Sequence, residues 1–165
     1  YGASKAAIDE LIKMYNQKHG LNIKSLRLAQ VIGLGERKGY LFNTFIDNAI
    51  KKQPLNIWGT GAGRRQYVYI KDVISAIFAA FSSSKGGIYN VGMQGDISAY
   101  ELAMLINHVF GNDGNYQVKK EKPEDLQRRC MDVTKIKEEL GWESAYTVET
   151  ALYDLKKIIR EEKNE

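Results

Sequence analysis

The chain has 165 residues, with 44% hydrophobic and 27% charged residues, which is ordinary for a globular domain and excludes a disordered or low-complexity chain. A single cysteine, Cys130, excludes an internal disulfide, and with two histidines a structural zinc site is not expected. The net charge of +4 permits an anionic partner, but the basic residues are scattered as short pairs, which argues against nucleic acid binding. With no secretion signal and no apolar stretch long enough to cross a bilayer, we expect a cytoplasmic protein with no membrane partner.

In chain order, the sequence first predicts an amphipathic helix that ends at Gly20. Its apolar stripe consists of Ile8, Leu11, Ile12 and Tyr15. Residues 23–32 predict one strand, buried on both faces toward its end. A second helix is expected over residues 41–50, ending before Pro54.

Short strands are expected at residues 55–59 and 66–70, on either side of a glycine-rich turn. Asp72 is a good N-cap for a helix over residues 73–81, and Gly86 and Gly87 then turn the chain into a strand over residues 88–92.

Ser98 and Glu101 form the capping box of a helix that runs to Phe110. A strand over residues 116–120 follows, and Asp132 and Thr147 are candidate caps of two further helices. Because helices and strands alternate along the chain, the sequence predicts an α/β fold.

Tyr1 and Lys5 are spaced as Y-x-x-x-K, which places both side chains on one face of a helix. A nearby ammonium group and a helix N-terminus both favour the phenolate form of tyrosine, whose usual pKa of about 10 is too high for a base at neutral pH. The pair could therefore act as a general acid/base. The same spacing recurs at Tyr67/Lys71, so the spacing alone is weak support.

Five segments in order resemble the successive signatures of the NAD-dependent epimerase/dehydratase family, which are extended short-chain dehydrogenases of the nucleotide-sugar epimerase type. They are YGASKAAIDELI, LRLAQVIGLGE, PLNIWGTGAGRRQYVYIKDV, IYNVG and PEDLQRRCMDVTKIKEELGW. The third segment, residues 54–73, is the most specific of the five. The turn at residues 59–63 is not the dinucleotide fingerprint, because its spacing is G-x-G-x-G and a strand follows it.

The resemblance implies an α/β fold that is the C-terminal part of an NAD(P)-binding, Rossmann-like extended short-chain dehydrogenase with its smaller substrate-binding lobe. Residues 1–33 and 67–92 would belong to the Rossmann-type domain, and residues 34–66 and 93–165 to the substrate-binding lobe. The N-terminal cofactor-binding half is then absent. We therefore expect the isolated chain to be inactive and to expose apolar surface, and the intact protein to be a homodimer that uses the first helix.

The resemblance also implies roles for residues near the cofactor. Tyr1 would be the acid/base, and Lys5 would contact the nicotinamide ribose and favour the phenolate. Ala29 would lie at the nicotinamide end. Gln30 takes a position where many members place an asparagine against the phosphates of the sugar nucleotide.

Further residues are implied for the substrate. Asn56 and Trp58 would lie against the nucleotide base, although Trp58 could equally be a core residue. Arg65 would bind the diphosphate, with a surface ion pair as the alternative. Arg64 beside it is expected to face solvent. The other two substrate residues, Lys122 and Asp125, fall in a loop that closes over the phosphates and ribose.

The function implied is that of an NAD- or NADP-dependent epimerase or dehydratase acting on a nucleoside-diphosphate sugar. Two alternatives stay open: an extended short-chain reductase of a non-nucleotide carbonyl compound, and a non-enzymatic basic α/β binding module.

Overall fold

The fold is described from a computed structural model, which covers residues 1–36, 39–126 and 130–162. Its helices are α1 (Gly2–His19), α2 (Leu41–Ile50), α3 (Ile70–Ser82), α4 (Ala99–Phe110), α5 (Thr134–Leu140) and α6 (Val148–Glu161). Its strands are β1 (Lys24–Leu28), β2 (Gln30–Ile32), β3 (Leu55–Trp58), β4 (Arg64–Arg65), β5 (Tyr67–Tyr69), β6 (Gly87–Val91), β7 (Ile97–Ser98) and β8 (Tyr116–Lys119). Among the described residues, none of the helices is long and apolar enough to cross a membrane.

The strands associate in pairs. Three pairs are parallel, β1 with β6, β2 with β5, and β3 with β8, whereas β4 and β7 run antiparallel. Parallel pairs need a crossover between their strands, and here helices supply much of each crossover. The mixed α/β class expected from the sequence is confirmed.

The strand expected over residues 23–32 is divided in two at Ala29. The Ala29 amide donates to the carbonyl of Val91 at the end of β6 (2.8 Å), and the next amide, that of Gln30, donates to the carbonyl of Gln66 (3.3 Å). The prediction of one continuous strand was wrong because the backbone changes partner at this residue. Hydrophobic periodicity reports burial, and it does not report which strand accepts the hydrogen bonds.

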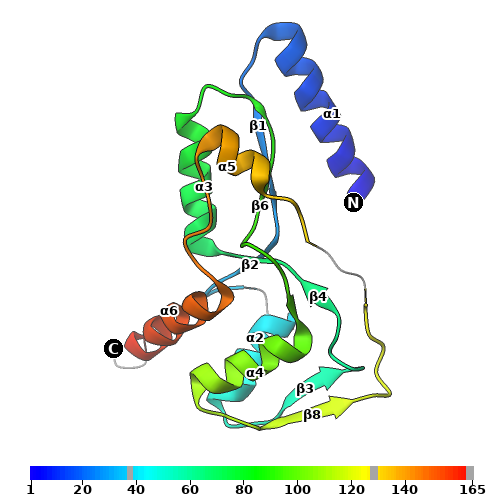
Figure 1. Cartoon of the computed structure of the whole chain (residues 1–165), viewed down its shortest axis with the longest axis vertical. Coiled ribbons are helices and arrows are strands. Elements are labelled where there is room, and N and C mark those ends of the chain that lie inside the picture. Colours follow the sequence, from blue (N-terminus) through cyan, green and yellow to red (C-terminus); the bar gives the residue numbers. More distant parts are fainter. Residues whose placement is uncertain (37–38, 127–129, 163–165) are drawn as a thin grey trace.

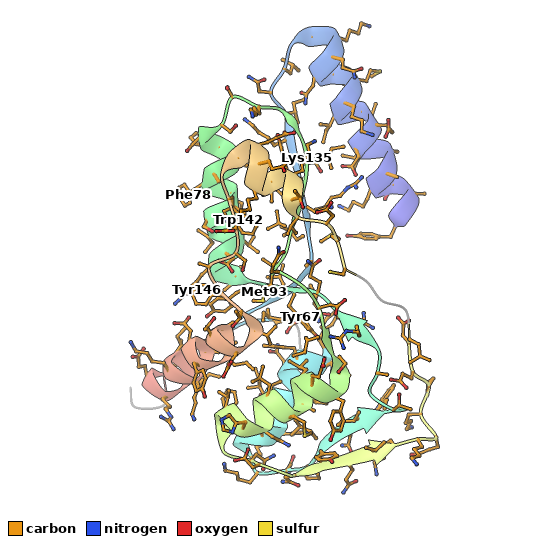
Figure 2. All side chains as sticks on the ribbon, in the orientation of Figure 1. Tyr67, Phe78, Met93, Lys135, Trp142 and Tyr146 are labelled. Carbon is orange, nitrogen blue, oxygen red and sulfur yellow. The ribbon has the colours of Figure 1, made fainter. Side chains whose placement is uncertain are left out.

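Two hydrophobic clusters form the interior of this elongated molecule (Figure 1). The larger lies among α2, α4, α6 and β3, and its fully buried members include Phe42, Leu102 and Leu152. The smaller lies among α3, α5 and β6 and is built around Tyr89 and Trp142. Tyr67 and Met93, which belong to the larger cluster, lie between the upper and lower parts of the molecule (Figure 2).

A polar residue of helix α1 makes the buried contact between this helix and the β1–β6 strand pair. Asp9 is the buried residue of this helix. Its carboxylate accepts hydrogen bonds from Ser25 Oγ (2.9 Å) and Arg27 Nε (2.7 Å). The arginine is the main reason that the pKa of Asp9 lies below its usual value. Ile8, Leu11 and the rest of the expected apolar stripe lie on exposed or half-buried faces instead.

The expected helix caps have different outcomes. The Ser98–Glu101 capping box is present, Thr147 caps α6, and Gly20 and Gly111 adopt the left-handed conformation that ends α1 and α4. Asp72, however, does not cap α3, because that helix begins two residues earlier, at Ile70. The carboxylate of Asp72 instead accepts hydrogen bonds from the segment before α6, namely from Ser144 Oγ and the amides of Ala145 and Tyr146 (2.5–3.2 Å).

Candidate functional site

Tyr1 and Lys5 lie together at the start of α1. Tyr1 is the N-cap residue and its side chain is 97% exposed, while the ammonium of Lys5, one turn along, lies 5.4 Å from the centre of the phenol ring. Both polar groups are open to an incoming molecule, so the donor set fits the expected role beside a cofactor ribose and a sugar hydroxyl.

A pocket of about 360 Å³ joins the expected cofactor and phosphate residues. Ala29, Gln30 and Arg65 all line it, together with Cys130 and Met131. Gln30 begins β2, and its backbone pairs with β5 at Tyr67. The pocket also lies at the carboxyl end of β1, since Leu28 lines it, and carboxyl ends of parallel strands are where ligands bind in α/β folds. The structure therefore brings Ala29, Gln30 and Arg65 to one cavity.

Glu36 lies beside Gln30 with an incompletely satisfied carboxyl group. Gln30 Nε2 donates to its Oε1 over 3.5 Å, and its Oε2 is buried with no hydrogen-bond partner among the residues that the structure describes. Burial raises the pKa of this carboxyl group above its ordinary value. The phenol of Tyr67 is buried nearby, where desolvation raises its pKa to about 12. A buried carboxyl oxygen without a partner is suited to accept a hydrogen bond from a ligand.

Asn56 and Trp58 lie on the exposed face of β3, where they alternate with the buried residues Leu55 and Ile57. Trp58 is 53% exposed, which excludes the alternative that it is a core residue. The ammonium of Lys122 lies 5.8 Å from the centre of its ring. A flat aromatic face with a cation beside it can stack on a base and attract an anion.

The two arginines of β4 differ in their partners. Arg65 forms an ion pair with Asp125 (3.6 Å), and both side chains are more than one-third exposed. Arg64 donates through Nε to Asp96 (2.6 Å) and lies 3.1 Å from Glu101 through Nη1. The side chain of Arg64 is 37% exposed, so part of it faces solvent as expected, but two carboxylates hold its guanidinium. Arg65, held by one half-exposed partner, is the better placed of the two to bind an anion.

Glu124 connects the segment of Lys122 and Asp125 to the glycine-rich turn. Its carboxylate accepts hydrogen bonds from the amide and the hydroxyl of Thr60 (2.6 and 2.9 Å) and from the amide of Gly63 (3.1 Å). These bonds, that of the Thr60 amide first, lower the pKa of Glu124. The turn is thus confirmed as a turn, and its amides bind a carboxylate of the same chain.

A second and larger pocket, of about 560 Å³, is lined by β4, the 92–97 turn and the segment before α6. Arg65 lines this pocket as well as the smaller one. Trp142 and Tyr146 supply much of its aromatic wall (Figure 2). Arg65 is therefore reached from both cavities.

The structure groups the expected site residues into three sets. The first set is Tyr1 and Lys5. The second set is Ala29, Gln30 and Arg65, and the third is Asn56, Trp58 and Lys122. Asp125 joins the third set to the second through Arg65. Tyr1 is not among the lining residues of either pocket that contains Arg65, within the part of the chain that the structure describes. In the same described residues, no group of His, Cys, Asp and Glu is arranged to hold a metal ion.

Sequence reasoning missed three residues of this region. Gln66, almost fully buried, donates to the carbonyl of Met93 and accepts from the amide of Met131, which fixes the chain beside the smaller pocket. Glu36 could have been noticed as a carboxylate shortly after the carboxyl end of a parallel strand. Glu124 carried no signal beyond its place between Lys122 and Asp125.

Comparison with known proteins decides the family. The family model described as "NAD dependent epimerase/dehydratase family" matches residues 1–92, more than half of the chain. The chain belongs to this epimerase/dehydratase family. The matched part begins with Tyr1 and Lys5 and runs through Gln30 and Arg65 to the end of β6.

Relatives within this family carry out different reactions. UDP-N-acetylglucosamine 4-epimerase from Bacillus cereus superposes with a TM-score of 0.85 at 31% identity, over 97% of this chain and 53% of that one. A dTDP-glucose 4,6-dehydratase from Xanthomonas campestris is 29% identical, over 92% of this chain and 46% of its own length. UDP-glucuronic acid decarboxylase 1 from Arabidopsis thaliana is 24% identical, over 92% of this chain and 35% of its own length. The chain thus spans about half, or less, of the proteins it matches.

Proposed function

We propose that this chain supplies the substrate-binding part and the catalytic tyrosine of an NAD(P)-dependent epimerase or dehydratase of nucleoside-diphosphate sugars. The observation that carries the proposal is that Gln30 and Arg65, 35 residues apart in sequence, line one pocket. Gln30 begins β2, which pairs in parallel with β5, and Arg65 lies in β4, which comes just before β5 in the chain. Each relative described above is named for a reaction of a UDP- or dTDP-linked sugar.

For the chemical step we propose that Tyr1 exchanges a proton with a sugar hydroxyl. Lys5 lies one helical turn away, with its ammonium 5.4 Å from the centre of the phenol ring, so both polar groups can reach the same sugar hydroxyl and cofactor ribose. The nicotinamide cofactor supplies a hydride acceptor for the sugar carbon when it is bound. Lys5 and the backbone at Ala29 would contact this cofactor. Ala29 lies at the carboxyl end of the β1–β6 pair, and Lys5 lies on α1, the helix that packs against that pair.

For substrate binding we propose that Arg65 binds the diphosphate and that Gln30 donates to a phosphate oxygen. Asn56 and Trp58 would contact the base, and Lys122 with Asp125 would close over the phosphates and ribose. Contacts to the diphosphate lie far from the reacting carbon, so their binding energy can position the sugar ring.

At the level of domains, we infer that residues 1–33 and 67–92 belong to the Rossmann-type part and residues 34–66 and 93–165 to the substrate-binding lobe. In support, β1, β6 and α3 pack together around the smaller cluster, and α2, β3 and α4 around the larger one. The two parts share both clusters, because α5 and Trp142 join the smaller one and Tyr67 and Tyr69 join the larger one. The cofactor would be bound mainly by residues outside this chain. We therefore expect the 165 residues alone to show no turnover, and the exposed stripe of α1 to pair with a second copy in the intact enzyme.

The test is the affinity of the chain for UDP and dTDP, measured by calorimetry and by the rise in melting temperature. Arg65→Ala should weaken binding about 10- to 100-fold, because it removes charge-assisted hydrogen bonds to the diphosphate. Arg160→Ala, an exposed arginine of α6, is the matched control and should bind as the wild type does. If neither nucleotide binds the wild type, a substrate without a diphosphate, or a binding module without catalysis, becomes the better account.

A further inference from the structure

The contact between Glu124 and the glycine-rich turn is more extensive than a surface ion pair. Both carboxylate oxygens are used: Oε2 accepts from the amide and the hydroxyl of Thr60, and Oε1 accepts from the amide of Gly63. Amides that converge in a tight turn form a concave anion-binding site, and hydrogen bonds to a charged acceptor are stronger than neutral ones. The anion bound here is a side chain 61 to 64 residues away in sequence.

The glycines of the turn make this close approach possible. A Cβ at Gly59 would lie 2.3–2.8 Å from atoms of the Glu124 side chain, and a Cβ at Gly63 would lie 2.3 Å from the carbonyl oxygen of Asp125. Gly59 also has a φ of +61°, which L-residues rarely adopt. The turn is therefore shaped to receive the side chain of Glu124 and the backbone carbonyl of Asp125 directly.

The residues on either side of Glu124 reach two expected substrate residues. Lys122 lies over the ring of Trp58, and Asp125 pairs with Arg65. Neither contact could hold the segment by itself, because all four side chains are exposed or half-exposed and such pairs contribute little. Glu124, in contrast, attaches this segment to two backbone amides, those of Thr60 and Gly63, in a fixed geometry.

We propose that Glu124 is a positioning residue. Seated in the 59–63 turn, its carboxylate holds the segment that carries Lys122 and Asp125 across β3 and β4, and so sets these two residues for the substrate. The role of Lys122 and Asp125 toward a nucleotide rests on the proposed function, whereas the attachment of the segment by Glu124 does not. The experiment below separates the two.

The variants are chosen to remove the attachment in steps. Glu124→Ala removes all three hydrogen bonds, and Glu124→Gln keeps one acceptor oxygen. Thr60→Val removes the hydroxyl, which donates to Glu124 and accepts from the amide of Ala62 (3.3 Å). Glu121→Gln, an exposed carboxylate of the same segment, is the matched control. The turn and the segment lie outside the two hydrophobic clusters, so these variants should retain the far-UV circular dichroism spectrum of the wild type.

Two readouts need no nucleotide. Hydrogen exchange of the Thr60 and Gly63 amides, followed by NMR, should be at least tenfold faster in Glu124→Ala. Acrylamide quenching of tryptophan fluorescence should also increase, and it reports mainly on Trp58 because Trp142 is only 6% exposed. Glu124→Gln and Thr60→Val should lie between Glu124→Ala and the wild type. Unchanged exchange and quenching in Glu124→Ala would overturn the proposal.

The third readout is the affinity for UDP, arranged as a double-mutant cycle. Glu124→Ala should weaken UDP binding about tenfold in the wild-type background. It should have little further effect in a Lys122→Ala/Asp125→Ala background, because a positioning residue acts through the residues it positions. Full additivity would contradict the proposal and indicate a separate structural effect. If the wild type does not bind UDP, the proposed function fails, and exchange and quenching alone then decide whether Glu124 holds the segment.

Discussion

At the scale of single residues, Glu36 is the group whose environment is least suited to its charge. Within residues 1–36, 39–126 and 130–162, one oxygen of its carboxyl group is buried without a partner, and the hydrogen bond that Gln30 donates to the other is long, at 3.5 Å. An unsatisfied buried acceptor destabilises a folded protein by roughly 1–3 kcal/mol. Residues held in such an environment often lie at binding sites, and Glu36 adjoins Gln30, which lines the smaller pocket.

Glu36→Gln should raise the free energy of unfolding at pH 7 by about 1 kcal/mol, because it removes a charge from a site that disfavours it. The sign follows from the raised pKa: the folded state holds this proton more tightly than the unfolded chain, whose pKa is near 4.5. The wild type should therefore lose stability as pH rises from about 4.5 through the higher folded pKa. Urea unfolding at several pH values measures both effects.

Glu138→Gln, at an exposed position of α5, is the control for that experiment and should leave the pH dependence of stability unchanged. A Glu36→Gln protein less stable than the wild type at pH 7 would show that the carboxylate has a stabilising partner.

Residue patterns could propose Tyr1, Lys5 and Arg65 as site residues because each belongs to a motif with fixed local spacing. The structure places the first two on one helical turn, as that spacing requires. Glu124 and Gln66 could not be found in this way. Their partners lie about 60 residues away in sequence, and only the folded chain brings them together.

At the scale of elements, Asp72 shows how one side chain can join two helices. It lies in the first turn of α3 and is almost fully buried, and its carboxylate receives the segment that leads into α6. Trp142 reinforces this junction by donating from its indole nitrogen to Ser75 Oγ (2.8 Å). The start of α6 is therefore positioned by α3, which lies 70 residues earlier.

Asp72→Ala should lower the free energy of unfolding by about 2–4 kcal/mol, because it leaves one hydroxyl and two amide donors without their acceptor. Guanidinium unfolding measures the loss. Asp113→Asn, at an exposed position after α4, is the control and should change stability by less than about 0.5 kcal/mol. A loss below about 1 kcal/mol in Asp72→Ala would mean that water replaces the carboxylate.

Most elements could be predicted from the sequence because their end signals are local, as with the Ser98–Glu101 box and Gly111. The errors arose where contacts with residues distant in sequence determine the local structure. Asp72 fits an N-cap by residue type, yet a distant loop recruits its carboxylate. The break at Ala29 follows from the order of neighbouring strands, which hydrophobic periodicity does not encode.

At the scale of the whole molecule, two helices present apolar side chains to solvent. On α3, Phe78 and Phe81 are 66% and 86% exposed, and Figure 2 shows Phe78 on the outer side of the helix. On α1, Ile8, Leu11 and Met14 are about half exposed. Contiguous apolar surface of this kind marks an interaction site or an aggregation risk.

We expect the chain to self-associate at micromolar concentrations through these surfaces, since burial of apolar area favours association. The double variant Phe78→Glu/Phe81→Glu should shift sedimentation velocity profiles toward the monomer, and Leu11→Glu should do so if α1 contributes. Tyr153→Glu, at a half-exposed aromatic residue of α6, is the control and should leave the profile unchanged. A wild-type protein that is monomeric at all concentrations tested would contradict this expectation.

The single residue between β1 and β2 couples the alignment of two strand pairs. Lys24 aligns with Gly87 in one pair and Gln30 with Tyr67 in the other, and only Ala29 separates the two strands. A slip of β1 by one residue along β6 would carry β2 with it and turn the Gln30 side chain to the opposite face of the strand. The two strand pairs therefore cannot shift register independently. Correct pairing of β1 with β6 also sets the position of Gln30 in the pocket at Arg65.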